Sequence, residues 1–143
     1  MSSYDQNNVF AKILRGEIPS HRVYEDEHTI AFMDVMPQSN GHTLIVPKQA
    51  SRNLLDADPA VLSRTVLVVQ RIAKAALAAF SADGISVIQY NEQAGGQSVF
   101  HLHFHVIPRY AGVGMRPHSG TMESPDVLLA NAAKLKAALT ETT

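Results

Sequence analysis

Three histidines stand at alternate positions in one short run of the chain. His101, His103 and His105 are separated by Leu102 and Phe104. Side chains alternate across an extended strand, so we expect the three imidazoles on one face and the two apolar side chains on the other. Same-face neighbours lie about 6.5–7 Å apart at Cα, which lets adjacent rings share one small ligand. Three imidazoles on a core strand are costly unless they are hydrogen-bonded, so the pattern predicts a functional site.

Three interpretations of the run compete. The histidines could be structural groups whose hydrogen bonds are satisfied within the core. They could bind a metal such as zinc, for which imidazole is a common ligand, with His42 supplying a ligand from elsewhere. They could also perform covalent catalysis, in which the middle imidazole attacks an electrophile while its neighbours orient it and move protons.

The residues just upstream favour the catalytic interpretation. Gly95 and Gly96 allow the backbone to approach a ligand closely and to turn N–H groups toward an anion. Gln97 and Ser98 add side-chain donors. A donor-rich turn that leads directly into imidazoles suits the equatorial oxygens of a phosphate. The sequence therefore predicts a phosphoryl-transfer site with a nucleophilic histidine, although the two glycines alone would fit an ordinary hairpin turn equally well.

The elements that must position this site follow from the apolar pattern. Helices are expected at residues 9–14, 61–80 and 125–139. Strands are expected at residues 22–25, 29–33, 43–46, 85–90 and 99–107. Strands grouped around one long helix, without regular alternation of strand and helix, predict an α+β fold with an antiparallel sheet. The long helix is apolar on more than one face, so we expect one side to meet the sheet and the other a second subunit.

Length and composition limit the classes of protein. The chain has 143 residues with 45% hydrophobic content, which predicts a single domain over residues 1–143, with an extension from about residue 111. A net charge of −1 with no basic block argues against a nucleic-acid polymer as partner, whereas a single nucleotide needs only a few donors. With no cysteine, disulfides and thiolate metal sites are excluded. No apolar stretch is long enough to cross a membrane, so a cytoplasmic protein is predicted.

Several segments in the same order resemble the histidine triad (HIT) superfamily of nucleotide hydrolases and transferases. The segment 95–107 resembles its motif, and the segments 10–19, 31–38 and 41–48, with Asn91-Glu92, resemble its other blocks. The resemblance covers most of the chain. It implies a HIT-like fold with a five-stranded antiparallel sheet, one long and one short helix and a C-terminal helix. It also implies a homodimer with a continuous sheet.

The resemblance implies a catalytic role for five residues. His103 would attack the α-phosphorus of a purine nucleotide, giving a nucleotidyl-histidine that water then hydrolyses. His105 would contact the phosphate and the bridging atom. His101, linked to His42, would fix the tautomer and orientation of His103. Ser98 would donate to the leaving group.

The resemblance also implies a set of substrate-binding residues. They are Asp34, Val35, Phe32, Phe10, Ile13, Asn91, Gly96 and Gln97. Asp34 would accept hydrogen bonds from the ribose hydroxyls, and Gln97 and Asn91 would hold phosphate oxygens. The four apolar residues would line a purine pocket, although apolar pattern alone fits plain core better, and Asp34 alone would also fit a turn. His21, His28 and His118 match no catalytic position and are expected on the surface.

The departures from the family pattern narrow the expected chemistry. Many bacterial relatives carry a Cys-x-x-Cys pair at the positions of Asn8 and Ala11, which forms a structural zinc site with two histidines. Without those cysteines no zinc is expected there, and no cofactor is expected. His105 stands where the uridylyltransferase branch has glutamine, which favours a hydrolase. The segment 106–110 differs from the Gly-Gly-Arg that often follows in the phosphoramidase branch, which leaves the preferred leaving group open.

The leading hypothesis is therefore a hydrolase that releases a purine monophosphate from a phosphoramidate or a related conjugate. A dinucleoside polyphosphate hydrolase is one alternative. A nucleotide-binding regulatory protein with little turnover and a metal-dependent enzyme are the others.

Overall fold

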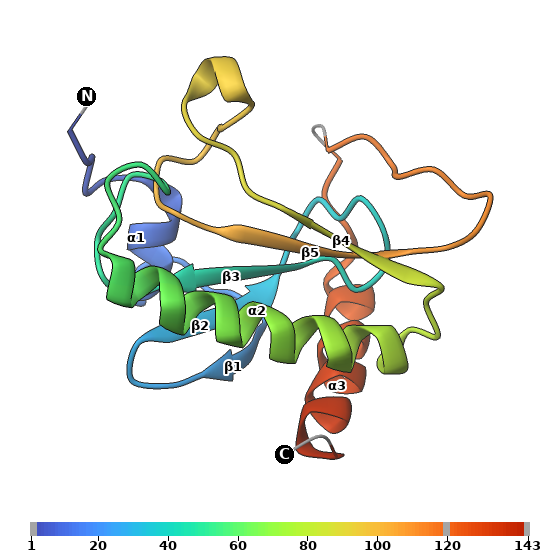
Figure 1. Ribbon diagram of the computed structural model, residues 1–143. Coiled ribbons are helices and arrows are strands. Elements are labelled where there is room, and N and C mark those ends of the chain that lie inside the picture. The colour runs from blue at the N-terminus through green and yellow to red at the C-terminus, as the bar shows by residue number, and fades with distance from the viewer. Residues whose placement is uncertain (1–2, 119–120, 142–143) are drawn as a thin grey trace.

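The computed structural model describes residues 3–118 and 121–141 as one α+β unit built on a five-stranded sheet (Figure 1). Positions 1–2, 119–120 and 142–143 of the expected domain lie outside the described residues. In chain order the elements are α1 (Val9–Leu14), β1 (Arg22–Glu25), β2 (Thr29–Met33), β3 (Thr43–Pro47), α2 (Pro59–Ala79), β4 (Gly84–Ile88), the 3-10 turn η1 (Gln93–Gly95), β5 (Phe104–Arg109) and α3 (Pro125–Glu141). The strand order is β1-β2-β3-β5-β4, and every neighbouring pair is antiparallel. The predicted fold class and sheet are confirmed.

The register of the sheet separates a core face from a site face. Phe32 pairs with Leu44 and Leu44 pairs with His105, so these side chains share one face. Ile45 pairs with Phe104 on the opposite face. Helices α2 and α3 pack on the Ile45 side and build the larger apolar cluster. The short helix α1 supplies apolar side chains to a second cluster, on the Phe32 side.

Local side-chain hydrogen bonds fix where the helices begin. Asn8 caps α1, because its side-chain oxygen accepts a hydrogen bond from the backbone N–H of Ala11 at 2.8 Å. Asp58 caps α2 through the N–H of Ala60 in the same way, and Pro59 takes the first helical position, where its missing N–H costs nothing. The start of α1 agrees with the predicted residue 9, and α2 begins two residues before the predicted residue 61.

The last strand differs from the prediction. It was expected over residues 99–107, but β5 begins only at Phe104. The chain before it bends away from the sheet, and the N–H of Leu102 donates to the carbonyl of Ser51 at 2.8 Å. His101 and His103 therefore precede the strand, and the expectation that three imidazoles share one strand face is wrong. Only His105 lies within the sheet.

None of the helices in the described part of the chain is both long and apolar enough to cross a membrane.

Candidate active site

The imidazole of His103 is held with one nitrogen free. Its Nδ1 lies 2.6 Å from the carbonyl oxygen of His101. A carbonyl can only accept, so the proton sits on Nδ1 and Nε2 keeps its lone pair. Burial lowers the pKa of His103 to about 4, although the carbonyl partly opposes this, so the ring is neutral near pH 7. The ring of Phe10 meets it edge-on with centroids 4.8 Å apart, which restricts its rotation.

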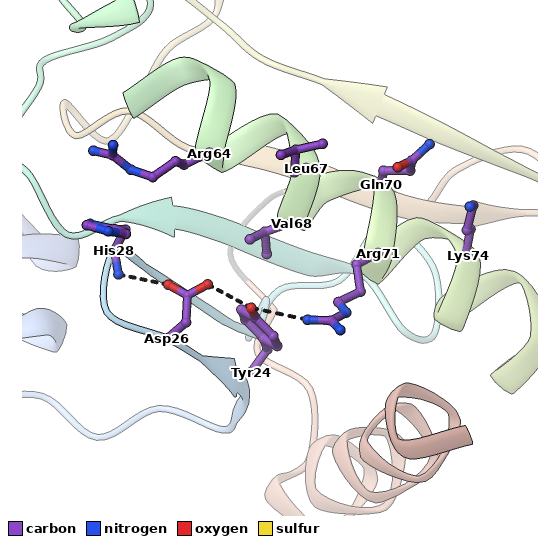
Figure 2. A pocket seen from close by; sticks show the side chains of 9 residues that line it. All are labelled: Tyr24, Asp26, His28, Arg64, Leu67, Val68, Gln70, Arg71 and Lys74. Atoms are coloured by element: carbon purple, nitrogen blue, oxygen red, sulfur yellow. Dashed lines mark hydrogen bonds between the residues drawn. The ribbon is translucent and has the colours of Figure 1, made fainter. Parts of the chain in front are cut away.

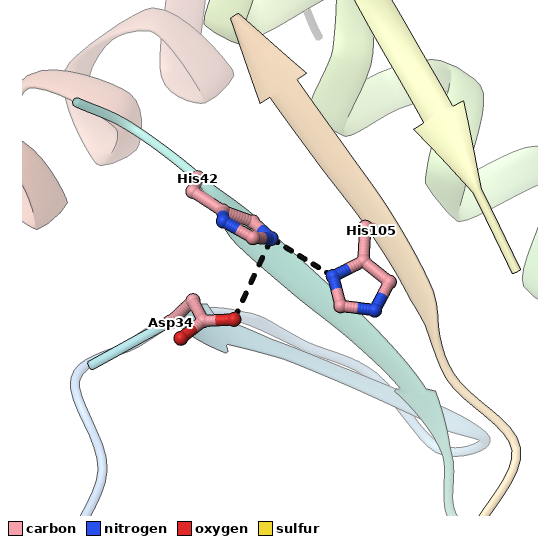
Figure 3. A group of neighbouring side chains, drawn as sticks. All are labelled: Asp34, His42 and His105. Atoms are coloured by element: carbon pink, nitrogen blue, oxygen red, sulfur yellow. Dashed lines mark hydrogen bonds and ion pairs between the residues drawn. The ribbon is translucent and has the colours of Figure 1, made fainter. Parts of the chain in front are cut away.

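His105 carries its proton on the opposite nitrogen, because a chain of hydrogen bonds sets its tautomer. The backbone N–H of Gln38 donates to Nδ1 of His42 at 3.0 Å, so the proton of His42 sits on Nε2. That Nε2 donates in turn to Nδ1 of His105 at 2.9 Å (Figure 3). The proton of His105 is thereby placed on Nε2. Burial lowers the pKa of His42 to about 3 and that of His105 to about 4, so both rings are neutral.

The predicted link between His101 and His42 is wrong. Nε2 of His101 donates to the carbonyl of Pro47 at 2.8 Å, and its Nδ1 accepts from the hydroxyl of Tyr4 at 2.6 Å. His42 pairs with His105 instead. The physical reason is the bend before β5, which turns the ring of His101 toward the end of β3. His101 contacts His103 through its carbonyl rather than through its ring.

Asp34 follows β2 and is almost fully buried, at 4% exposed. Its Oδ1 accepts from the N–H of Met36 at 2.8 Å, and its Oδ2 accepts from Nε2 of His118 at 2.9 Å. Burial alone would raise the pKa of Asp34, but the hydrogen bond from His118 and the neighbouring His42 and Met36 N–H outweigh it, so the pKa is lowered. The same hydrogen bond raises the pKa of His118.

The expected exposure of His118 is confirmed, but the residue also lies at the site, which the sequence did not predict. Its ring lies against the rings of His105 and His42, with centroids 6.0 and 5.7 Å away, and it binds Asp34. No motif or periodicity marks this residue, since it lies in an irregular segment far along the chain from Asp34. Only the folded chain brings the two together.

One cavity of about 360 Å³, within the usual range for small-ligand sites, is lined by His103, His105 and His118 but not by His42 or His101. Six predicted site residues line it: Phe10, Asp34, Gly96, Ser98, His103 and His105. Five residues that sequence reasoning did not assign to the site also line it: Gln38, Leu44, Tyr90, Val99 and His118. Leu44 could have been found from its alternation with neighbouring strand residues, and Gln38 from the segment 31–38.

The side chain of Gln97 is not available for the predicted contact with phosphate. Its Nε2 donates to the carbonyls of Arg52 and Val99, and its Oε1 accepts from Asn53 and from the N–H of Glu92. All its hydrogen-bonding capacity is thus used inside the fold. Gln97 fixes the loop that carries Gly96 and Ser98 to the cavity.

Asn91 also lies outside the cavity lining. Its Oδ1 accepts from the N–H of Leu54, and its amide exchanges hydrogen bonds with Gln89. The prediction that Asn91 holds phosphate oxygens directly is therefore not supported by this geometry. Asn91 instead ties the segment after β4 to the segment before α2.

The four residues predicted to form a purine pocket are divided by the fold. Phe10 lines the cavity, whereas Ile13 and Phe32 lie in the apolar cluster around it and are buried. Val35 is 36% exposed and is not part of the lining. The apolar wall of the cavity comes instead from Phe10 together with Leu44 and Val99.

Gly96 cannot be replaced without strain. Its φ is +103°, in the left-handed region that side chains rarely adopt, and a Cβ here would lie 2.9 Å from the ring of Tyr90. Gly96 lines the cavity, as predicted, and Gly95 does not. The prediction that the two glycines turn N–H groups toward an anion is wrong, because these groups donate to the carbonyls of Glu92 and Gln93.

A metal ion is a further candidate for this site. Asp34, His42 and His105 each offer a ligand atom, all within 4.8 Å of one another (Figure 3). A ligating histidine normally donates its second N–H to an acceptor. In His42 that second nitrogen faces the N–H of Gln38, so Nε2 must carry the proton and has no lone pair for a metal. The hydrogen bonds thus favour a chain of neutral hydrogen-bonded imidazoles over a metal centre.

A second cavity, of about 460 Å³, lies between α2 and the β1–β2 hairpin (Figure 2). Its polar groups serve the fold: the Tyr24 hydroxyl donates to Asp26 at 2.7 Å, and Arg71 donates to the same hydroxyl at 3.4 Å. The only histidine in its lining is His28, so the paired neutral imidazoles are found at the smaller cavity.

Comparison with known proteins defines the class to which this fold and site belong. Residues 15–112 match the model of the HIT domain, so the chain belongs to the HIT family. A HIT-like protein involved in cell-cycle regulation from Bartonella henselae is 54% identical, with a TM-score of 0.92 over 96% of this chain and 99% of that chain. Protein hit of Bacillus subtilis is 41% identical over 73% of this chain and 72% of its own length. The adenylylsulfatase HINT3 of Arabidopsis thaliana is 38% identical over 82% of this chain and 64% of its own length.

Proposed function

We propose that the protein is a nucleotide hydrolase that attacks the α-phosphate of purine nucleoside phosphoramidates or related conjugates and releases a nucleoside monophosphate. The observation that carries the proposal is the opposite proton placement on two adjacent rings. His103 offers a lone pair on Nε2, and His105, with its ring centroid 5.1 Å away, carries a proton on Nε2. A nucleophile and a hydrogen-bond donor thus stand side by side in one cavity.

The first step forms a covalent intermediate. Nε2 of His103 attacks the α-phosphorus, and the bond from phosphorus to the leaving group breaks. The Nε2–H of His105 donates a hydrogen bond to the leaving group, with Ser98 at the cavity wall as a further donor, and the leaving group takes up a proton from solvent water. His103 then carries the nucleotidyl group. The hydroxyl of Ser98 and the Nε2–H of His105, both at the cavity, are suited to the oxygens of the phosphate.

The second step restores the enzyme. Water attacks the phosphorus and releases a proton to solvent, while the Nε2–H of His105 donates to a phosphate oxygen. The bond from phosphorus to Nε2 of His103 breaks, and the nucleoside monophosphate leaves. Two displacements through a covalent intermediate replace one difficult step by two easier ones.

The family supports the substrate class. The relative HINT3 is by name an adenylylsulfatase, and adenylyl sulfate is an adenylate whose α-phosphate carries a leaving group. The apolar wall of Phe10, Leu44 and Val99 suits a flat base, and the carboxylate of Asp34 suits donating ribose hydroxyls. Nothing in the cavity restricts the leaving group to an amine, so acyl, sulfate and nucleotide leaving groups are also substrates to test.

Turnover of defined conjugates tests the proposal. Wild type, His103→Ala and the matched control His21→Ala are incubated with adenosine phosphoramidate, adenylyl sulfate and diadenosine tetraphosphate, with and without chelator. We expect turnover of at least one conjugate by wild type and by His21→Ala, unchanged by chelator, and none by His103→Ala. Mass spectrometry of a quenched His105→Asn reaction should show a nucleotidyl adduct on His103.

Each other outcome contradicts a defined part of the proposal. Equal turnover by wild type and His103→Ala removes His103 as nucleophile. Loss of turnover with chelator favours a metal-dependent enzyme. Binding of a purine nucleotide without turnover of any conjugate favours a nucleotide-binding regulatory protein.

A further inference from the structure

The carboxylate that is suited to the ribose is already occupied in the free protein. Asp34 lines the cavity, yet it is only 4% exposed, and its Oδ2 accepts a hydrogen bond from Nε2 of His118 at 2.9 Å. Its Oδ1 accepts from the N–H of Met36. A ribose hydroxyl that approaches this carboxylate from the cavity meets the ring of His118.

His118 is held at this place by the segment that follows β5. The N–H of Arg116 donates to the carbonyl of Gln38 at 2.8 Å, and the N–H of Glu123 donates to the carbonyl of Val35 at 2.8 Å. These two backbone contacts lie on either side of His118 in the chain. They fasten Arg116 and Glu123 to the turn that follows Asp34, and so present His118 to the carboxylate.

We propose that His118 competes with the ribose of the substrate for the carboxylate of Asp34, so that a ribose hydroxyl must displace His118 in order to bind that carboxylate. The inference rests on the proposed function, because it assigns the ribose to Asp34. His118 then sets how strongly the site selects for ribose hydroxyls. It is a specificity-determining residue contributed by the C-terminal segment.

The charge of the cavity supports this competition. No lysine or arginine is among the described residues that line it. The His118–Asp34 contact is the one place in the lining where a carboxylate and a hydrogen-bond donor of opposite charge can pair. A hydroxyl group of the ribose must replace this contact, and it gains a charge-assisted hydrogen bond in return. A ligand without hydroxyls gains nothing by displacing His118.

The expected change in affinity depends on the fraction of molecules in which His118 covers Asp34. If His118 covers Asp34 in about nine molecules of ten, apparent affinity for a ribonucleotide is reduced about tenfold. Removal of the imidazole should raise the affinity about tenfold for a ligand that binds Asp34. It should leave the affinity unchanged for a ligand that does not.

Calorimetric titration of two ligands tests the inference. Wild type, His118→Ala and the control His21→Ala are titrated with adenosine monophosphate and with its 2′,3′-dideoxy analogue. We expect His118→Ala to bind adenosine monophosphate about tenfold more tightly and the dideoxy analogue as wild type does. His21→Ala should match wild type for both. An equal change for both ligands, or weaker binding of adenosine monophosphate by His118→Ala, overturns the competition.

A measurement without ligand separates this inference from the proposed function. In an NMR titration of the histidine rings, Asp34→Asn should lower the pKa of His118 relative to wild type. If it does not, the contact is absent in solution and the inference fails while the proposed function stands. If neither wild type nor any variant binds adenosine monophosphate, the proposed function fails, and the inference with it.

Discussion

At the scale of single residues, the chemistry depends on which nitrogen of each ring holds the proton. A backbone carbonyl fixes the proton of His103, and a backbone N–H, acting through His42, fixes that of His105. Neither partner is a conventional acid or base. Two opposite tautomers of the same side chain are thus produced by two opposite kinds of main-chain group. The identity of the residue at position 42 should therefore matter through its hydrogen bonds rather than its charge.

Replacement of His42 tests this chain of hydrogen bonds. In His42→Gln the amide can still accept from the N–H of Gln38 and donate to Nδ1 of His105. In His42→Leu it can do neither, so His105 loses its preference for a proton on Nε2. We expect His42→Leu to lower kcat on the order of a hundredfold, whereas His42→Gln retains most of it. Steady-state kinetics on the substrate that wild type turns over best measure the difference. Equal losses in both variants would mean that the ring itself, not its hydrogen bonds, is required.

At the scale of elements, the sequence predicted regular structure better than the loops that carry the site. Both strands of the first hairpin, residues 22–25 and 29–33, lie where their pattern indicated. The start of β5 was misplaced because alternation continues through residues 99–103 although the backbone there bends toward Ser51. His118 could not be found, because its partner Asp34 is distant in sequence. Alternation in the sequence predicts which side chains share a face of a strand, but it does not predict where the backbone leaves the sheet.

The loop between β4 and β5 depends on the side chain of Gln97. Gln97 holds it through four hydrogen bonds, so its removal should affect stability before binding. We expect Gln97→Ala to lower the free energy of unfolding by about 2 kcal/mol, because buried partners lose their hydrogen bonds. Gln97→Glu, of the same shape, should be at least as harmful, because a carboxylate would face the carbonyls of Arg52 and Val99. Urea denaturation measures both.

A contrasting result would restore the original interpretation of Gln97. If Gln97→Ala leaves the free energy of unfolding unchanged and raises only the KM for substrate, the residue holds phosphate directly, as the family resemblance implied. The stability and the KM of the same variant therefore decide between the two roles.

At the scale of the whole molecule, the buried histidines make stability depend on pH. The folded pKa values of His42, His103 and His105 are lowered to about 3, 4 and 4, while an unfolded histidine titrates near pH 6.5. Between those values the unfolded chain binds more protons than the folded one, so stability falls as the pH falls. Each of the three histidines contributes up to about 1.4 kcal/mol per pH unit. His118, whose pKa is raised, acts oppositely: its contribution is present below pH 6.5 and is lost as the pH rises through its folded pKa.

Acid should therefore unfold the protein. A loss of several kcal/mol between pH 6.5 and pH 4.5 is comparable with the whole stability of a domain, about 5–15 kcal/mol. We expect the free energy of unfolding, from urea titrations at several pH values, to fall steeply below pH 6. In His42→Gln, which lacks one buried titrating ring, the decrease should be shallower. A stability that is constant from pH 7 to pH 5 would contradict the burial of these rings as neutral groups.

Assembly is the last property that belongs to the whole molecule, and we expect the predicted homodimer to form at the edge of the sheet. Strand β4 lies at the edge of the sheet, with one side of its backbone unpaired by any described strand. Val87 pairs with Val106, which is buried in the α2 cluster, so Val87 faces the same side as α2 but is 50% exposed. An open edge beside exposed apolar side chains favours pairing with a second copy, and a twofold axis there would join two sheets into one.

We expect light scattering to give a dimer at micromolar concentration for wild type. Val87→Lys should give a monomer, whereas Leu129→Lys, a matched change at a residue of α3 that is 61% exposed, should leave the dimer intact. A monomeric wild type would exclude the dimer, and a dimer that survives Val87→Lys would place its interface elsewhere, because a lysine at this edge adds like charges across the axis and removes the apolar contact that the continuous sheet requires.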